Sequence, residues 1–322
     1  MSIYIEKIGE IGRYLNEVYV DTLDKMMQKD ERVLCVEADL AGASGTLPLK
    51  PKYGDRFIDV GIAESNLYGI AAGLSKAGKI PYAHTFAAFA TRRAADQIFI
   101  SGCYAGANVK VIASAPGIMA QLNGGTHMCF EDLAIVRGFA GMTVMEPSDG
   151  WQLAFVLEKV REIYGMHYIR LARKNNYRFY QEGSQFEIGK AVMLRDGSDV
   201  TIIACGAILV NEARIAAEVL AKQGISARVL DMFTIKPIDR EAVEKAARET
   251  GAIVTAENHN VFGGLGSAVA EAIVETIPVP MERVGIQDAF GQVGTMEELQ
   301  EVYGLTADNI VRKCLNVIKR KH

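Results

Sequence analysis

One glutamate stands where a carboxylate could do acid–base chemistry. Glu64 follows a short apolar stretch, residues 57–60, and a glycine, and the apolar residues after it recur at helical spacing. We therefore expect Glu64 in the first turn of a helix, at the carboxyl edge of a sheet, where open parallel sheets bind ligands. A desolvated glutamate there could share a proton with a bound ring nitrogen. The alternative is a glutamate that only complements the helix dipole.

Two aromatic residues and a histidine follow the next expected strands. Phe86 and Phe89 come after the strand 80–84 and could form a wall for a planar heterocycle, although core packing is the simpler alternative. His127 ends the long loop 113–127, whose glycines allow the backbone to approach a ligand closely. The histidine is a candidate proton carrier, and its alternative is an ordinary surface-loop residue.

A candidate anion ligand follows a further strand. Arg173 comes just after the expected strand 167–171 and could grip an anionic group with two nitrogens, or could be a solvated linker arginine. Glu64, the two aromatics, His127 and Arg173 thus all follow strands of one expected sheet. Because the carboxyl ends of parallel strands share one edge, we expect a single ligand site along that edge.

These residues depend on a scaffold of alternating strands and helices. Uninterrupted apolar strands such as residues 33–36 are typical of strands buried on both faces. The apolar patterns predict helix 9–28, strands 33–36 and 57–60, a helix from 64, strand 80–84, helix 91–104, strand 109–114, helix 130–137, strand 142–146, helix 148–161 and strand 167–171. This alternation predicts a largely parallel sheet with helices on both sides.

A polar, aperiodic stretch over 173–186 precedes a second series of elements, so we expect the domain boundary there. The second series consists of strands 199–204, 226–231, 252–256 and 282–287 and helices 207–222, 239–249 and 266–276. We predict an α/β protein of two doubly wound domains, residues 1–180 with a parallel sheet and residues 187–322 with a smaller mixed sheet. The glycines of 263–266 fit tight packing at a helix start better than a phosphate cradle.

Composition argues against several classes of protein. The 322 residues carry a net charge of −4 and no Lys/Arg cluster interleaved with aromatics, so a nucleic-acid partner is not expected. The five cysteines are widely spaced and lack a CxxC pair, which argues against a disulfide framework and a metal site. The N-terminus has no signal-like pattern and no uncharged apolar run reaches membrane-spanning length, so we expect a cytoplasmic protein.

Several segments together resemble transketolase, specifically its pyrimidine-binding and C-terminal domains. The segments are Gly61-Ile-Ala-Glu64-Ser65, Thr85-Phe86-Ala-Ala-Phe89, Arg93-Ala-Ala-Asp-Gln97, Gly124-Gly-Thr-His127, Glu131-Asp132, Glu146-Pro-Ser-Asp149 and Leu171-Ala-Arg173. The resemblance covers essentially the whole chain. The family's first domain, whose Gly-Asp-Gly motif holds magnesium and the diphosphate, has no counterpart in this sequence.

The resemblance implies one subunit of a split enzyme. This chain would be the C-terminal subunit, and an N-terminal transketolase subunit would supply the diphosphate-binding domain, in an α2β2 heterotetramer. The implied cofactors are thiamine diphosphate and Mg²⁺, with the metal bound mainly by the partner subunit. The implied substrates are sugar phosphates, and the implied setting is carbohydrate metabolism of the pentose phosphate kind.

The resemblance also assigns roles around the cofactor. Glu64 would hydrogen-bond the aminopyrimidine nitrogen and set the tautomer with which the cofactor removes its own thiazolium proton. Phe86 and Phe89 would flank the pyrimidine ring. Asp39, in an Ala-Asp-Leu segment, would lie near the cofactor.

For the substrate, the resemblance implies His127 at the donor hydroxyls, with a share in catalysis, and Arg173 at the sugar phosphate. Three positions depart from the family pattern. Asn123 stands where many transketolases have an acidic residue, Ala115 replaces a histidine that helps to bind phosphate, and Arg92 replaces an aromatic. These changes leave cofactor activation intact and bear on the choice of sugar, with Asn123 in the substrate site.

The main functional prediction is a thiamine diphosphate-dependent transferase that moves a two-carbon ketol unit from a ketose phosphate to an aldose. The alternative is the β subunit of a 2-oxo acid dehydrogenase, which has the same two domains and the same glutamate. The segments Gly125-Thr-His127 and Leu171-Ala-Arg-Lys-Asn175 favour transketolase. We expect activity only when the partner subunit is present.

Overall fold

Buried, uninterrupted strands form the centre of the sheets. The computed structural model describes residues 7–321, so residues 1–6, where no signal pattern is expected, and residue 322 lie outside the described residues. Every residue of β1 (Val33–Glu37), β3 (Ile80–Phe86), β4 (Lys110–Ser114) and β6 (Met166–Leu171) is buried. Such complete burial is expected of parallel strands that are covered on both faces.

The first sheet has seven strands in the order β10-β5-β6-β4-β3-β1-β2. Its other strands are β2 (Phe57–Asp59), β5 (Met142–Met145) and β10 (Thr234–Lys236). All pairings are parallel except that of β10 with β5. Successive residues of β1 point to opposite faces, because Val33 and Cys35 belong to one buried cluster and Leu34 and Val36 to another. The sheet is therefore covered on both sides.

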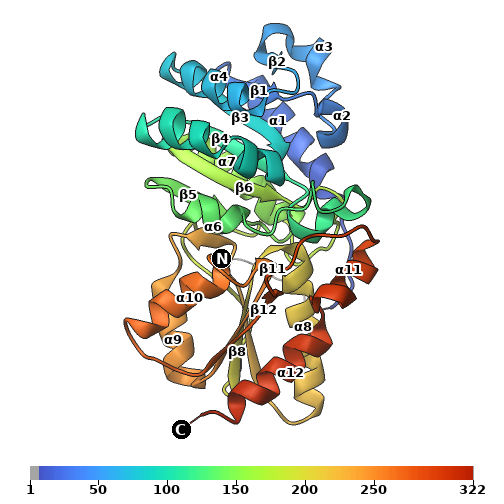
Figure 1. The fold of residues 1–322 in the computed structure, drawn as a ribbon, viewed down its shortest axis with the longest axis vertical. Coiled ribbons are helices and arrows are strands. Elements are labelled where there is room, and N and C mark those ends of the chain that lie inside the picture. Colours follow the sequence, from blue (N-terminus) through green and yellow to red (C-terminus); the bar gives the residue numbers. More distant parts are fainter. Residues whose placement is uncertain (1–6, 322) are drawn as a thin grey trace.

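Helices provide that cover, as Figure 1 shows. They are α1 (Leu15–Lys29), α2 (Ala41–Ser44), α3 (Leu49–Tyr53), α4 (Glu64–Lys76), α5 (Ala95–Gln97), α6 (Asp132–Arg137) and α7 (Gly150–Glu162), with π-helical turns at Phe89–Arg93 and Ile98–Tyr104 and 3₁₀ turns at Gly54–Arg56 and Gly117–Asn123. The predicted helix 91–104 is thus α5 with its flanking π-helical turns. The first helix begins at Leu15 instead of residue 9, because Ile11 forms an antiparallel bridge with Tyr177.

The second domain contains a five-stranded mixed sheet in the order β12-β11-β8-β9-β7. Its elements are β7 (Val192–Arg195), β8 (Val200–Ala204), α8 (Gly206–Lys222), β9 (Ala227–Asp231), α9 (Arg240–Thr250), β11 (Ile253–Asn260), α10 (Leu265–Val274), β12 (Met281–Ile286), α11 (Met296–Tyr303) and α12 (Ala307–Ile318). Strand β7 runs antiparallel to β9, and the other pairs are parallel. The predicted class of two α/β domains, with a parallel sheet before a smaller mixed one, is confirmed. Across residues 7–321, no helix is both long and apolar enough to cross a membrane.

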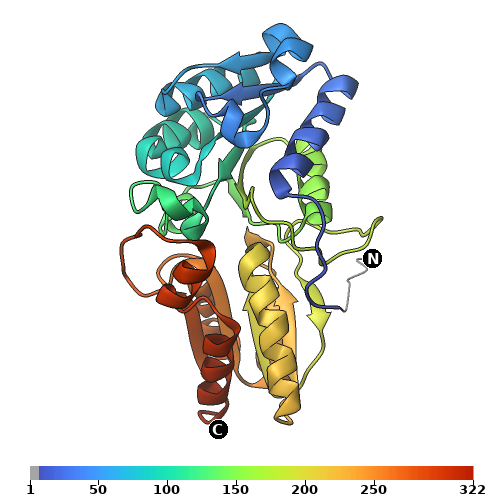
Figure 2. The same cartoon turned by 90° about the vertical axis from the view of Figure 1, so that its right-hand side faces the viewer.

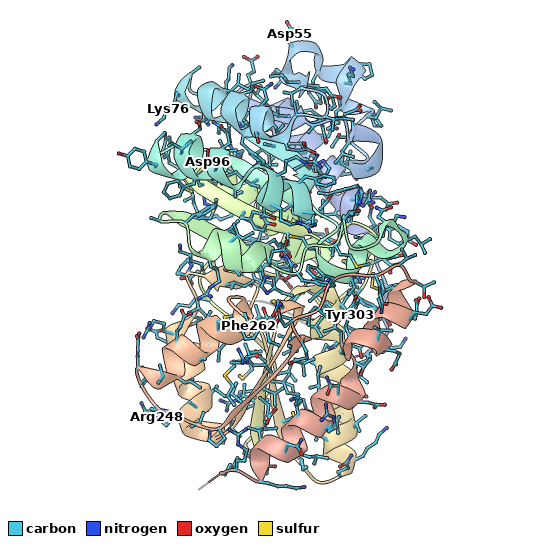
Figure 3. The ribbon with its side chains drawn as sticks, in the orientation of Figure 1. Asp55, Lys76, Asp96, Arg248, Phe262 and Tyr303 are labelled. Atoms are coloured by element: carbon cyan, nitrogen blue, oxygen red, sulfur yellow. The ribbon has the colours of Figure 1, made fainter. Side chains whose placement is uncertain are left out.

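The two domains are joined by more than a linker. Strand β10 lies in the second half of the chain, yet it completes the edge of the first sheet beside β5. The ring of Tyr303, in α11, packs edge-on against Phe130 with centroids 5.3 Å apart. Figure 2 shows α11 and the loop before it beside the first domain, and Figure 3 places Phe262 and Tyr303 near the boundary. The domain limits 1–180 and 187–322 remain a prediction.

A buried ion-pair network also crosses the boundary. Arg170 on β6 donates from Nε to Asp132 Oδ2 at 2.8 Å and from Nη1 to Glu146 Oε2 at 2.7 Å. Its Nη2 donates to the backbone oxygen of Asn258, on β11 of the second domain, at 3.0 Å. These charged side chains are almost completely buried. Because a buried charge is tolerated only with satisfied partners, the network fixes the carboxyl end of β11 against the first domain.

Candidate active site

Glu64 lies in the first turn of α4, a few residues after β2 ends, as the sequence predicts. Its side chain is only 3% exposed. Oε1 accepts a hydrogen bond from Arg93 Nη1 at 2.7 Å, whereas the buried Oε2 has no hydrogen-bond partner within the described residues. A buried acceptor without a donor costs about 1–3 kcal/mol. The oxygen therefore marks a place where a donor from outside the chain would fit.

Phe86, Phe89 and His127 form an aromatic cluster. The ring centroids of the two phenylalanines are 5.9 Å apart. The His127 ring lies edge-on, 6.2 Å from Phe86 and 5.2 Å from Phe89. Phe86 is buried, whereas Phe89 and His127 each keep part of their surface accessible. Edge-on and offset contacts are the favoured geometry of such rings, and the accessible part of the cluster can receive another planar ring.

Two arginines connect this aromatic cluster to both ends of the site. The Arg93 guanidinium, which binds Glu64, lies 4.1 Å from the centre of the Phe89 ring. The Arg173 guanidinium lies 4.9 Å from the centre of the Phe86 ring. Partial burial lowers the pKa of Arg173, but a guanidinium titrates so far above neutral pH that it stays charged. Contacts therefore run without a break from Glu64 to Arg173. We call these residues the site ridge: Glu64, Arg93, Phe89, Phe86, His127 and Arg173.

The loop that carries His127 is held by backbone contacts. Ala115, at its start, has a φ of +52°, a conformation that costs free energy unless its surroundings hold it. Gly125 lies so close to the carbonyl group of Gly291, in the second domain, that any side chain there would overlap it. Arg92 donates to the backbone oxygens on both sides of His127, at 3.0 and 2.9 Å. The arginine that replaces a family aromatic thus clamps this loop.

Two predicted residues lie outside the site ridge. Asp39 is exposed, has a φ of +57°, and donates its backbone N–H to Asp59 Oδ1 at 2.9 Å. Asn123 is exposed at the end of the 3₁₀ turn Gly117–Asn123. In the part of the chain that the structure describes, neither side chain makes a hydrogen bond or a ring contact with the site ridge. Their roles remain predictions.

Four polar residues near the site have no role in the sequence-based prediction. Arg93 pairs with Glu64, and Glu37, His84 and Ser114 hydrogen-bond to one another on three adjacent strands. For Glu37, His84 and Ser114, the sequence contains one indication of a shared site: each is a polar residue near the carboxyl end of a largely apolar strand. That signal becomes specific only when the strand order is known, because side chains meet across neighbouring strands.

A second carboxylate lies at a helix N-terminus, that of Glu257, and both of its oxygens accept hydrogen bonds from its own domain. Its Oε2 accepts from the backbone N–H of Leu265 at 2.6 Å, and its Oε1 from that of Gly266 at 2.7 Å. A side chain at Gly264 would overlap this carboxylate. The preference for tight packing over a phosphate cradle at 263–266 is therefore confirmed, because Glu257 fills the anion position. Burial raises the pKa of Glu257 to about 7.

Two family models match the chain and together cover most of it. The transketolase pyrimidine-binding domain matches residues 14–178, and the transketolase C-terminal domain matches residues 189–310. These two matches follow the two sheets in chain order.

Relatives of similar length carry both domains. The chain is 51% identical to the 6-deoxy-6-sulfo-D-fructose transketolase subunit SqwH of Clostridium sp. (strain MSTE9), covering 96% of each chain. It is 35% identical to a subunit of the apulose-4-phosphate transketolase of Phocaeicola vulgatus, covering 94% of this chain and 96% of that one. A solved structure described as a split gene transketolase, inactive beta4 tetramer, is 41% identical, with a TM-score of 0.88, and covers 97% of this chain and 100% of that one. The predicted transketolase subunit is thereby confirmed over the dehydrogenase alternative. The chain belongs to the transketolase family, as a split-enzyme subunit that carries the pyrimidine-binding and C-terminal domains.

Proposed function

We propose that this subunit and an N-terminal, diphosphate-binding subunit together form one active site for thiamine diphosphate. The observation that carries the proposal is the buried, unpartnered Oε2 of Glu64, joined through Arg93 to the aromatic cluster. A protonated ring nitrogen is the kind of donor that this acceptor lacks. When bound, thiamine diphosphate supplies the carbon nucleophile that breaks a carbon–carbon bond next to a carbonyl group.

The residues of this chain would hold the pyrimidine ring and control one proton. Phe86 and Phe89 would flank the ring, with Asp39 near its rim. Glu64 would exchange a proton with the ring nitrogen through Oε2, while Arg93 keeps Oε1 in place. His127 would contact the donor hydroxyls and carry a proton there.

The partner subunit would hold the diphosphate and Mg²⁺, and we propose an α2β2 assembly in the cytoplasm. The site residues named above would supply contacts to a pyrimidine and a sugar, and the diphosphate would need a separate anion site. The reaction would be the transfer of a two-carbon ketol unit from a ketose donor to an aldose acceptor.

For the donor, we propose a ketose whose far end carries a sulfonate, with 6-deoxy-6-sulfo-D-fructose as the compound to test first. The name of the 51% identical relative suggests this sugar. The charge available at the site supports this choice, because a sulfonate carries one negative charge and a phosphate ester about 1.5–2. Arg173 offers one guanidinium, and Ala115 takes the place of the family's second phosphate donor. We therefore favour this sugar over the pentose phosphates of the sequence-based prediction.

The experiment is a comparison of kcat/KM for three donors on the enzyme assembled with its N-terminal subunit. The donors are 6-deoxy-6-sulfo-D-fructose, fructose 6-phosphate and xylulose 5-phosphate, each with a common acceptor. We expect the sulfonated donor to give the highest kcat/KM. A clear preference for xylulose 5-phosphate would contradict the proposed substrate and leave transketolase activity itself intact.

Two variants sharpen this comparison. Ala115→His restores the second phosphate donor and should raise kcat/KM for fructose 6-phosphate relative to the sulfonated donor by roughly 10-fold, the value of one hydrogen bond to a charged group. Asn123→Asp is the matched control, because Asn123 would face the hydroxyl groups that both donors share, so its change should affect the two donors alike. If the Ala115→His variant leaves the ratio unchanged, position 115 does not select the terminal group.

A further inference from the structure

Three buried polar side chains lie beneath the site on adjacent strands. Glu37 on β1 and His84 on β3 are register partners, and their Oε2 and Nδ1 atoms are 2.7 Å apart. His84 Nε2 lies 2.8 Å from the hydroxyl oxygen of Ser114, the last residue of β4. All three residues have no exposed surface. We call them the relay.

The donors around the relay assign its protons. Glu37 Oε1 accepts hydrogen bonds from the hydroxyl groups of Ser44 at 2.9 Å and Thr46 at 2.7 Å. Because a carboxylate only accepts, His84 donates Nδ1–H to Glu37, and its Nε2 faces the Ser114 hydroxyl. This order of serine, histidine and acid is that of a hydrolase triad, but the Ser114 oxygen is sealed in the core and cannot meet a substrate.

Both ends of the relay lead to Arg173. At one end, Ser44 follows Ala43, whose backbone oxygen accepts a hydrogen bond from Arg173 Nη1 at 2.6 Å. At the other end, Ser114 precedes Ala115, whose N–H donates to the backbone oxygen of Leu171 at 3.1 Å. The same oxygen accepts the backbone N–H of Arg173 at 2.9 Å. The contacts therefore form a closed ring that fixes the backbone and the guanidinium of Arg173.

We propose that the relay of Glu37, His84 and Ser114 is a positioning device that aligns Arg173 with the anionic end of the substrate. The proposal rests on the role of Arg173 in the proposed function. It gives a task to a fully buried polar chain that links three adjacent strands of the sheet. Because the relay has no access to the substrate, its effect must pass through Arg173.

The test uses the enzyme assembled with its N-terminal subunit and two donors, the sulfonated ketose and uncharged erythrulose. His84→Asn keeps a donor near Glu37 but does not reach Ser114, and Ser114→Ala is a milder break at the same contact. We expect His84→Asn to raise KM for the charged donor about 10-fold or more, since small displacements of a binding group have effects of that size. KM for erythrulose and kcat for both donors should change less than about twofold.

Tyr82→Phe is the matched control. Tyr82 lies on the same strand, two residues before His84, and its hydroxyl group donates a buried hydrogen bond to the backbone oxygen of Leu157 at 2.7 Å. Its loss removes a buried side-chain hydrogen bond on the same face, outside the closed ring. We expect the ratio of the two KM values to stay at the parental value. A ratio that shifts equally in the control and in His84→Asn would overturn the positioning role.

A double-mutant cycle with Arg173→Ala separates this inference from the proposed function. Arg173→Ala alone should raise KM for the charged donor by roughly 10–150-fold, and adding His84→Asn should raise it no further. If Arg173→Ala affects both donors alike, the proposed role of Arg173 fails. The relay is structural and the inference fails if Arg173→Ala raises KM for the charged donor alone, as expected, while His84→Asn and Ser114→Ala only lower the melting temperature. The inference also fails if their effects on KM add fully to that of Arg173→Ala.

Discussion

Each domain holds a buried carboxylate near a helix N-terminus, and the hydrogen bonding of the two carboxylates differs. Glu257 sits on β11 at the N-terminus of α10, and both of its oxygens accept backbone N–H groups. Glu64 begins α4, where one oxygen binds Arg93 and the other has no partner in the described residues. The comparison shows that a helix N-terminus at a sheet edge becomes a candidate site only where a buried acceptor is left open.

The carboxyl edges of the two sheets differ in the same way, because one is covered and the other presents the candidate site. Ligands bind outside the carboxyl ends of strands in open α/β sheets, so both domains could provide a site by fold alone. In the second domain that edge is packed against the first domain, where Cys205 Sγ lies 3.3 Å from Glu146 and Arg170 binds the carbonyl group of Asn258. The first domain instead presents the site ridge. We infer that the second domain closes one face of the subunit and leaves the chemistry to the first.

The largest effect is expected from replacing Glu64, whose Oε2 is the acceptor without a partner in the described part of the chain. Glu64→Gln should slow proton exchange at the thiazolium carbon of bound cofactor by about 10²–10⁴-fold, because an amide cannot take part in the proton transfer. The variant should fold and assemble normally, since the changed group has one unpaired oxygen in the parent. Deuterium exchange followed by quenched NMR measures the rate. Exchange at the parental rate would reduce Glu64 to a residue that complements the helix dipole.

The next largest effect is expected from disrupting the buried ion-pair network at the domain boundary. Arg170→Met removes the cation that satisfies Asp132 and Glu146, and the free energy of unfolding should fall by about 3–5 kcal/mol, as for other buried ion pairs that lose one partner. Arg240→Met is the control, because Arg240 forms an exposed pair with Glu275 and should contribute at most about 1 kcal/mol. Urea denaturation gives both values. Equal, small losses would show that the interface network is not a stabilising element.

A smaller effect is expected from the titration of Glu257. Burial raises the pKa of Glu257 from an ordinary value of 4.5 to about 7. Between these values the folded protein keeps a proton that the unfolded chain has lost. The contribution of Glu257 to the free energy of unfolding is therefore fully present below pH 4.5 and falls as the pH rises to 7, with a slope of at most about 1.4 kcal/mol per pH unit.

Glu257→Gln removes that titration. The difference in unfolding free energy between the parent and the variant should change by about 1–3 kcal/mol between pH 4.5 and 7, to the relative disadvantage of the parent at the higher pH. Urea denaturation at several pH values measures it. Parallel curves for the two proteins over this range would contradict the assignment.

Much of the scaffold was predictable, because apolar strands and helical spacing are local properties of the sequence. Glu64 could be placed at the start of a helix for that reason, and the segments of the first domain could be recognised together. Strand β10 (Thr234–Lys236) could not, since three residues carry no reliable pattern and their pairing with β5 joins distant parts of the chain. The helices α11 and α12 are also absent from the sequence-based prediction.

The candidate site was predictable only in part. Phe86 is the last residue of β3, Phe89, His127 and Arg173 follow strand ends, and the parallel topology brings the four together. The pairing of Arg93 with Glu64, and the hydrogen bonds within the relay, depend on which strands and turns become neighbours in space. Hydrogen bonds of this kind are set by tertiary structure, so no local pattern reveals them.

We propose that this chain supplies the pyrimidine half of a thiamine diphosphate site that a partner subunit completes. Calorimetric titration of thiamine diphosphate with Mg²⁺ tests it most directly, with the cofactor added to this subunit alone, to the N-terminal subunit alone, and to an equimolar mixture. We predict tight, magnesium-dependent binding in the mixture and at most weak binding to this subunit alone. Tight, magnesium-dependent binding by the isolated chain would show that it holds the cofactor without a partner subunit.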